Sequence, residues 1–356
     1  MKQETEINEL INRVRALEND SIEFDEAAIH AEYQHIAGEK SSLAIKIITI
    51  FGGLLATLTL LGFFAGAKLF ESEIGCMISG VIFIAASIGL NKIESKLIID
   101  TFSISLFVSG LSLIGIAFDQ FNANDNILPL TFIGICAATL MITQRYILSF
   151  ISILVINGSI LGLIEMHREY QLIHIYIAII TAILVTWFLK EAKIISANKK
   201  ISKLYRPFRI GFTISYVFGL FLAMKNFFNQ QVVSNTWISS VFTISASLFV
   251  VYILCNVLQV KQIKDRILVY LVSLLVLSST AMMPAIPGSI LIILLSFRVN
   301  FKTGLVIGIL SFIYFVSQYY YDLSFSLLTK SYMMLGTGAL FLLIYLFTYK
   351  KLQAHE

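Results

Sequence analysis

The residues of this sequence that could do chemistry are few, because only a handful of ionisable side chains fall inside its long apolar runs. A charged side chain at the centre of a membrane helix costs about 2.5 to 3.5 kcal/mol, so each one needs a partner or a purpose. Lys330 stands at the start of the last apolar run, with Ser331 beside it and Asp322 eight residues earlier. We expect Lys330 and Asp322 to form an ion pair at the membrane surface; a docking or binding point is the alternative.

Three further polar residues lie within apolar runs. Asp100 is about one turn inside its run and follows Lys96 by four residues, a spacing that favours an ion pair at the helix end over a proton or cation site. Asn157 and Asn256 are expected to be buried. Each could make one hydrogen bond between helices, which we favour, or the two could line a polar cavity.

The sequence contains no recognisable catalytic, cofactor-binding or metal-binding pattern. It has no HExxH zinc motif, no Gly-x-Ser-x-Gly nucleophile frame and no Gly-rich P-loop. Cys76, Cys136 and Cys255 are an odd number of cysteines without CxxC or Cys/His spacing, so they are expected to be small core residues. We therefore expect no catalytic residue, no cofactor and no metal, and predict that the protein is not an enzyme.

The elements that must position these side chains are membrane helices. Of the 356 residues, 57% are hydrophobic and only 13% are charged, whereas soluble globular proteins average roughly 25% charged residues; the mean hydropathy is +0.83. Apolar runs of about 20 residues, the length that crosses a bilayer as a helix, recur from Leu43 onward. This composition excludes a soluble enzyme and predicts an all-α integral membrane protein whose first partner is the lipid bilayer. The basic residues lie in separate loops, which argues against nucleic acid as a partner.

We expect about twelve transmembrane helices, preceded by a short cytoplasmic helical head. The predicted spans are residues 43–66, 74–90, 97–118, 127–143, 146–164, 172–189, 208–228, 237–258, 266–283, 286–298, 303–320 and 327–349. The tenth is short and follows the Pro284–Gly288 break, so the ninth and tenth spans either both cross or form a tight hairpin or re-entrant element. With the N-terminus inside, 22 of the 26 Lys and Arg residues fall on the cytoplasmic side, which predicts that both termini are cytoplasmic.

The predicted spans divide the chain into five segments. Residues 1–42 form an acidic cytoplasmic segment with apolar residues at helical spacing, 43–189 a first six-helix half, 190–209 a basic linker, 210–349 a second six-helix half, and 350–356 a cytoplasmic tail. A boundary between repeats would fall in 190–209, although no residue pattern of the first half returns in the second.

Small residues in the spans predict close helix packing. The pairs Gly62/Gly66, Gly158/Gly162 and Gly304/Gly308 have the Gly-x-x-x-Gly spacing that lets helices approach. Several Ser and Thr residues in spans 97–118 and 237–258 are expected to hydrogen-bond within or between helices, and lining a pathway is the alternative.

The C-terminal stretch carries a resemblance to a known family. It reads Tyr319-Tyr320-Tyr321-Asp322-Leu323-Ser324-Phe325-Ser326-Leu327-Leu328-Thr329-Lys330-Ser331, followed by Gly336 and Gly338. This aromatic cluster, polar turn, Leu-Leu-x-Lys-Ser step and Gly-containing last span resemble the signature of a bacterial polytopic membrane family, domain of unknown function 4401, related to the 2157 family. The resemblance implies a bacterial inner-membrane (plasma-membrane) protein of unassigned activity, with a possible small membrane-anchored partner of the Gly-Asp-Tyr-x-x-Leu-x-Tyr type. It assigns no role to Lys330, Ser331 or Asp322.

Two functions from different classes are compatible with the sequence. We favour a multi-pass scaffold or assembly component that acts with a membrane partner, because charge inside the membrane is scarce and the head is acidic. The alternative is a secondary transporter or lipid-intermediate flippase with two six-helix halves. A polar cavity at mid-membrane would favour the alternative.

Overall fold

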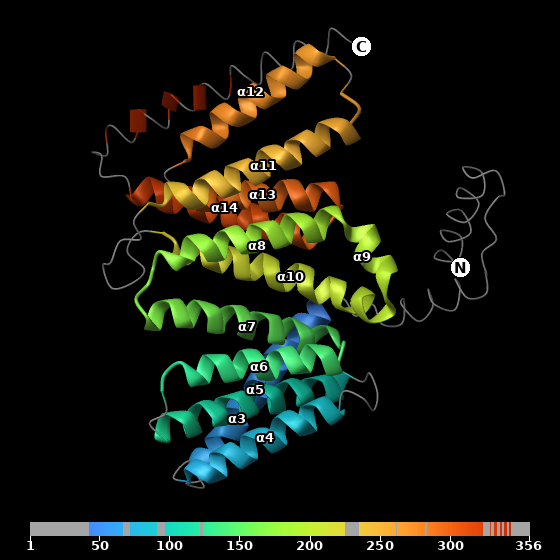
Figure 1. Ribbon diagram of the computed structural model, residues 1–356, viewed down its shortest axis with the longest axis vertical. Helices are drawn as coiled ribbons and strands as arrows, with labels where there is room; N and C mark the ends of the chain where they lie inside the picture. The colour runs from blue at the N-terminus through green and yellow to red at the C-terminus, as the bar shows by residue number, and fades with distance from the viewer. Residues whose placement is uncertain are drawn as a thin grey trace, which may run out of the picture. The chain divides into compact units, whose positions relative to one another are not determined.

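The computed structural model describes residues 43–66, 72–90, 97–121, 124–224, 235–260, 262–281 and 283–322, with eight positions between 328 and 342 (Figure 1). Within this described part of the chain the regular structure is entirely helical, as the composition predicted. The chain divides into two compact units, residues 1–116 and 117–356. The predicted head, residues 1–42, and the tail, residues 350–356, lie outside the described residues.

The first unit contains α3 (Leu43–Gly66), α4 (Glu73–Leu90) and most of α5 (Leu97–Gln120). Hydroxyl groups join α3 to α5: the Thr57 hydroxyl donates to the carbonyl oxygen of Gly53 in its own helix at 2.8 Å and lies 3.3 Å from that of Ser105. At the same contact, a Cβ on Gly53 would lie 2.8 Å from Ile104. Small and hydroxyl residues therefore set the α3–α5 distance, as is usual where lipid removes the hydrophobic drive for association.

Glycine and serine residues form a tight seam between α4 and α5. A Cβ on Gly80 would lie 2.9 Å from the carbonyl oxygen of Gly110, and a Cβ on Gly110 would lie 2.8 Å from that of Gly80. Farther along the same pair, the Ser87 hydroxyl donates to the Ser103 carbonyl oxygen at 2.7 Å, and the Ser103 hydroxyl lies 3.1 Å from the Ser87 carbonyl oxygen. The two helices touch backbone to backbone, so these glycines have no space for a side chain.

The second unit contains nine described helices. They are α6 (Ile127–Ile142), α7 (Tyr146–Met166), α8 (Leu172–Leu189), α9 (Glu191–Ala197), α10 (Lys199–Leu222), α11 (Trp237–Val257), α12 (Ile263–Ser279), α13 (Ala285–Arg298) and α14 (Lys302–Asp322). Its core gathers fully buried side chains from α8, α10 and α13, among them Ile177, Tyr216 and Leu291. The units divide within α5, and α7 and α8 pack on α10, so helices on either side of the predicted 190–209 linker belong to one unit.

α10 holds α7 and α8 in place. Figure 1 shows α7, α10 and α8 side by side, and α10 packs extensively on both neighbours, whereas α7 and α8 contact each other in few places. Two glycines of α10 allow the approach. A Cβ on Gly211 would lie 2.9 Å from Ile153 of α7, and a Cβ on Gly219 would lie 2.5 Å from the ring of Tyr176 of α8.

The predicted linker is mostly helical, and α10 begins at Lys199 instead of at residue 208. The Asn198 side chain caps the helix by accepting a hydrogen bond from the Lys200 backbone N–H at 3.0 Å, which satisfies one of the free donors of the first turn. Lys200, Lys203 and Arg206 are exposed while Tyr205 is buried. The predicted span began only at residue 208 because the first turns of α10 are amphipathic, and a search for apolar runs misses them.

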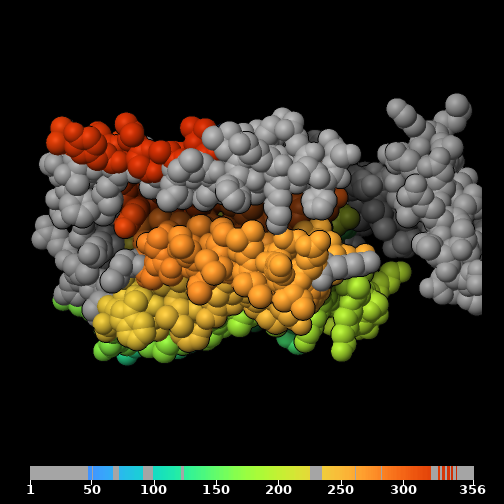
Figure 2. Space-filling view, turned by 90° about the horizontal axis from the view of Figure 1, so that it is seen from above, coloured from blue at the N-terminus to red at the C-terminus, as the bar shows by residue number. Residues whose placement is uncertain are grey.

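α12 and α13 do not form the tight hairpin considered for spans nine and ten. α13 packs against α11 and α14, whereas α12 packs mainly on α11 and exposes most of its large apolar side chains. Figure 2 shows α12 (orange) lying along α11 (yellow) at this face. α13 has 14 residues, about 21 Å at 1.5 Å per residue, shorter than the roughly 30 Å hydrocarbon core.

Seven described helices are long and apolar enough to span a membrane: α3, α4, α5, α7, α8, α11 and α14. α6 and α13 are shorter apolar helices. By the length and composition of its helices, the described part of the chain is that of a multi-pass helical membrane protein.

The Gly-x-x-x-Gly prediction holds for one pair and is wrong for two. A Cβ on Gly304 or Gly308 would meet atoms within 2.8 Å, but a Cβ on Gly62, Gly66, Gly158 or Gly162 would meet nothing within 4 Å. The motif does not show whether a second helix packs against the glycine face of the first. The spacing therefore could not distinguish glycines in a helix contact from glycines without a neighbour.

Candidate functional site

A lateral apolar groove between α7 and α8 is the candidate site of the second unit. Its volume is about 460 Å³, within the roughly 300 to 1,000 Å³ of small-ligand sites. One apolar stripe of each helix forms a wall: Ile156, Ile160 and Leu163 from α7, and Leu172, Ile175 and Ile179 from α8. The groove exists because α7 and α8 both pack on α10 and hardly contact each other.

The α8 wall opens towards the outside of the unit. Leu172, Ile175 and Ile179 are 43%, 56% and 53% exposed, yet all three line the groove. In a membrane protein such exposed apolar side chains face hydrocarbon. The groove is therefore accessible from the lipid and does not form a central polar channel.

Tyr176 closes the floor of the groove by joining three helices. Its hydroxyl lies 3.2 Å from Asn157 Oδ1 on α7 and 3.3 Å from the Ser215 carbonyl oxygen on α10, and it can donate to either. Asn157 Nδ2 in turn donates to the Ile153 carbonyl oxygen at 2.8 Å. The polar atoms of the floor thus bond to one another, and they fix the positions of α7, α8 and α10.

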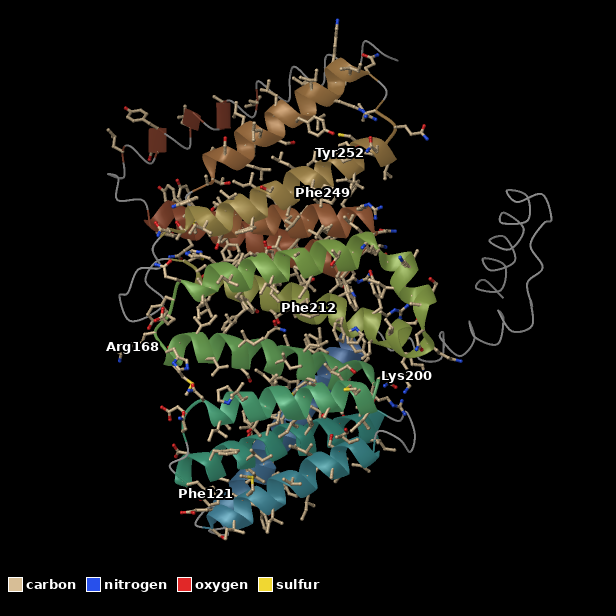
Figure 3. The ribbon with its side chains drawn as sticks, viewed as in Figure 1. Phe121, Arg168, Lys200, Phe212, Phe249 and Tyr252 are labelled. Carbon is tan, nitrogen blue, oxygen red and sulfur yellow. The ribbon has the colours of Figure 1, made fainter. Side chains whose placement is uncertain are left out.

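Aromatic rings close one end of the groove. Phe208 and Phe212 of α10 line it, and their ring centroids are 5.4 Å apart. Trp187 of α8 stacks on Phe208 at 5.2 Å and on Tyr205 at 6.1 Å. Figure 3 shows Phe212 beside α10 on the side towards α7.

The opposite end of the groove reaches the turn between α7 and α8. His167, which follows α7, lines the groove there, and Arg168 is the next residue, labelled at this turn in Figure 3. Arg168 has a φ of 55°, a left-handed backbone conformation that is unfavourable for residues other than Gly. Two carboxylates, Glu165 and Glu169, flank the pair, and all four side chains are exposed.

The structure buries one predicted asparagine and exposes the other. Asn157 is only 3% exposed and makes the interhelical hydrogen bond that we favoured. Asn256 is exposed near the end of α11, so the expectation of burial was wrong. Position in an apolar run gives depth along a helix but not the face, and Asn256 lies on an open face of α11. The two do not line one cavity.

The other predicted residues lie at the ends of helices. Asp100 is half-buried in the first turn of α5, and its predicted partner Lys96 lies outside the described residues. Ser331 is helical and exposed, Asp322 is the last residue of α14, and Lys330 is outside the described residues. The Lys330–Asp322 ion pair therefore stays a prediction.

An ion pair that the sequence analysis missed joins α9 to α10. Arg209 Nη1 donates to Glu191 Oε1 at 3.2 Å, and the Arg209 side chain is only 14% exposed. Its guanidinium lies 3.9 Å from the Phe301 ring centroid and 5.1 Å from that of Tyr205. Such cation–π contacts strengthen in desolvated surroundings. The basic residues of 190–209 were counted as one loop, which hid that Arg209 is a largely enclosed packing residue.

Hydroxyl groups on α11 form hydrogen bonds within and between helices, as we expected from the sequence. The Ser247 hydroxyl bonds to the Thr243 carbonyl oxygen at 2.8 Å and lies 3.4 Å from that of Pro287 on α13. The Ser239 hydroxyl lies 2.6 Å from Nδ1 of His174 on α8. His174 is a buried ionisable residue that spacing did not single out. The Ser247, Ser239 and His174 side chains therefore all bond within the described bundle.

Comparison with known proteins supports the resemblance carried by residues 319–349. The family model described as "Domain of unknown function (DUF4401)" matches residues 42–351. No curated protein and no solved structure matches the chain. The match covers nearly the whole membrane portion, so this chain belongs to the family of domain of unknown function 4401.

Proposed function

We propose that this chain is a bacterial inner-membrane protein of about twelve spans, with both termini in the cytoplasm. We further propose that it acts as a scaffold or assembly component with a membrane partner, and not as an enzyme. One observation carries this proposal: in the described second unit, Asn157, Tyr176, Ser247 and Arg209 bond within the helix bundle, and the groove between α7 and α8 is lateral and apolar.

The same observation weighs against a transporter or a flippase of anionic lipid-linked intermediates. A polar or anionic substrate needs hydrogen-bonding or cationic groups along its path, since unpaired polar groups in hydrocarbon cost several kcal/mol. The groove offers His167 at its end, and Asn157 and Tyr176 at its floor are already bonded to each other. An apolar groove with that floor suits a static role better than the passage of a polar solute.

Copurification tests the partner. The full chain is extracted in mild detergent from its native membrane and purified by an affinity tag, alongside Lys330→Ala and a deletion of residues 1–40. Lys264→Ala, which removes an exposed lysine of α12, is the matched control. We expect one stoichiometric membrane partner with wild type and control, and its loss with Lys330→Ala or the deletion. Recovery of every variant alone, with normal insertion, would refute the proposal.

Cysteine labelling tests the orientation. All three native cysteines are buried, so they give little background with a membrane-impermeant maleimide. Glu169→Cys, in the turn after α7, and Ser196→Cys, exposed at the end of α9, lie on opposite sides in the proposed topology. In spheroplasts we expect labelling at position 169 and protection at position 196 until the membrane is lysed. The reverse pattern would overturn the orientation.

A further inference from the structure

The groove between α7 and α8 matches one leaflet of a bilayer in length. From Leu172 to Ile183 its α8 wall runs over eleven residue steps, about 16 Å at 1.5 Å per residue. Half of the roughly 30 Å hydrocarbon core is about 15 Å. A lipid chain that enters at the turn would therefore reach the aromatic end formed by Phe208 and Phe212 with its terminal carbons.

The lining chemistry fits hydrocarbon. Apart from Asn157, Tyr176 and His167, every lining residue is aliphatic or Phe, and the α8 wall is exposed to the surrounding lipid. Burial of a CH₂ group from water is favourable by about 0.8 kcal/mol. A lipid chain in a membrane is already out of water, so its binding free energy must come from close packing against the groove walls. The walls are held in position because Tyr176 bonds α7 and α10 across the floor.

The turn at the mouth of the groove carries charge of both signs. Arg168 is held there in a left-handed conformation, which costs a non-Gly residue about 1 to 2 kcal/mol, and strain of this kind persists where the surrounding structure or a function requires it. A guanidinium is a strong phosphate ligand. The flanking Glu165 and Glu169 carboxylates would repel a purely anionic headgroup but would attract an ammonium group.

We propose that the α7–α8 groove holds one acyl chain of a zwitterionic phospholipid, with the phosphate against Arg168 and the ammonium group against Glu165 or Glu169. His167 lines the mouth between the chain and the headgroup. In the orientation proposed above, this lipid belongs to the leaflet away from the cytoplasm. The site is a bound-lipid site of the chain itself, so it does not depend on a protein partner.

Native mass spectrometry of the full chain tests the site. Delipidated protein in detergent is titrated separately with phosphatidylethanolamine and with phosphatidylglycerol. Ile160→Trp and Ile179→Trp fill the two walls, and Leu271→Trp adds the same ring to an exposed position of α12 as the control. We expect one tightly bound phosphatidylethanolamine for wild type and control, and at least ten-fold weaker binding for both filling variants.

The headgroup contact is tested by Arg168→Gly, which removes the guanidinium and relieves the left-handed backbone. Gln259→Gly is the matched control, because Gln259 has a φ of 52° and lies away from the groove, after α11. We expect Arg168→Gly to bind phosphatidylethanolamine at least five-fold more weakly at unchanged helix content, and Gln259→Gly to bind like wild type.

Three results would overturn the inference. They are no bound lipid in wild type, equal lipid binding by the groove-filling variants and Leu271→Trp, and tighter binding of phosphatidylglycerol than of phosphatidylethanolamine.

Tryptophan fluorescence gives a second measurement that does not depend on dissociation of the lipid in the gas phase. In Trp237→Phe, Trp187 is the remaining tryptophan and stacks on Phe208. Phosphatidylethanolamine brominated near the chain end should quench it, and Arg168→Gly should reduce that quenching.

Discussion

Removing the Tyr176 hydroxyl should destabilise the second unit by more than one ordinary hydrogen bond. Tyr176→Phe keeps the ring against Gly219 but deletes the donor that lies 3.2 Å from Asn157 Oδ1 and 3.3 Å from the Ser215 carbonyl oxygen. A hydrogen bond between membrane helices contributes about 0.6 kcal/mol on average. Asn157 is 3% exposed, so its oxygen would be left without this donor, at an added cost of about 1 to 3 kcal/mol.

Asn157→Leu should cost less than Tyr176→Phe, although it removes the same hydrogen bond. The Tyr176 hydroxyl keeps the Ser215 carbonyl oxygen as an acceptor, and leucine has the same branched arrangement of four heavy side-chain atoms as asparagine. We expect a loss of about 0.5 to 1 kcal/mol. In the Asn157→Leu background there is no orphaned oxygen, so adding Tyr176→Phe should cost only about 0.6 kcal/mol more.

The double-mutant cycle in detergent micelles measures this difference. Helix content of the full chain is followed by circular dichroism during titration with a denaturing detergent, for wild type, both single variants and the double variant. The coupling energy should be about 1 kcal/mol or more. Equal costs of Tyr176→Phe in both backgrounds, or a cost below about 0.3 kcal/mol in wild type, would refute the view that Tyr176 joins the three helices by hydrogen bonds.

Three further stability changes follow from the packing, each measured by the same unfolding assay. Gly80→Ala should destabilise the first unit by about 1 to 3 kcal/mol, because its Cβ would lie 2.9 Å from the Gly110 carbonyl oxygen, whereas Gly62→Ala meets nothing within 4 Å and should stabilise by about 0.5 to 1 kcal/mol. Arg209→Ala should cost about 1 to 3 kcal/mol through the lost Glu191 and Phe301 contacts, and exposed Arg206→Ala less than about 0.5 kcal/mol. Arg168→Gly and Gln259→Gly should each stabilise by up to about 1 kcal/mol, because both residues have left-handed backbones. A stability change of the sign opposite to the one expected, for any of these variants, would contradict the packing described above.

The ends of the helices were well predicted from sequence where apolar runs meet polar residues. The predicted spans 43–66, 127–143 and 172–189 agree with α3, α6 and α8 to within a residue. α10 and α12 were exceptions: α10 begins at Lys199 and not at 208, and α12 covers Ile263–Ser279 and not 266–283. The first two turns of α10 carry exposed lysines. Hydropathy detects contact with lipid, and a helix that extends beyond the bilayer has no such signal.

The faces of the helices could not be predicted from the same runs. In water a buried face is apolar and the other polar, but in lipid both are apolar. Asn157 and Asn256 both lie within apolar runs, yet one is buried and the other exposed. The glycine pairs failed for the same reason: Gly158 and Gly304 have identical spacing to their partners, and only Gly304 is packed.

The groove was missed because it is produced by α10, whose sequence has no unusual motif. Gly211 and Gly219 are eight residues apart, and each brings one neighbour close, α7 through Ile153 and α8 through Tyr176. Both neighbours are thereby fixed to α10 and not to each other, and the space between them is lined by aliphatic stripes that any membrane helix carries. A larger residue at either glycine would push one wall outward. The shape of the groove therefore depends on two positions that do not line it, so a search for binding residues in the sequence would have found the walls unremarkable.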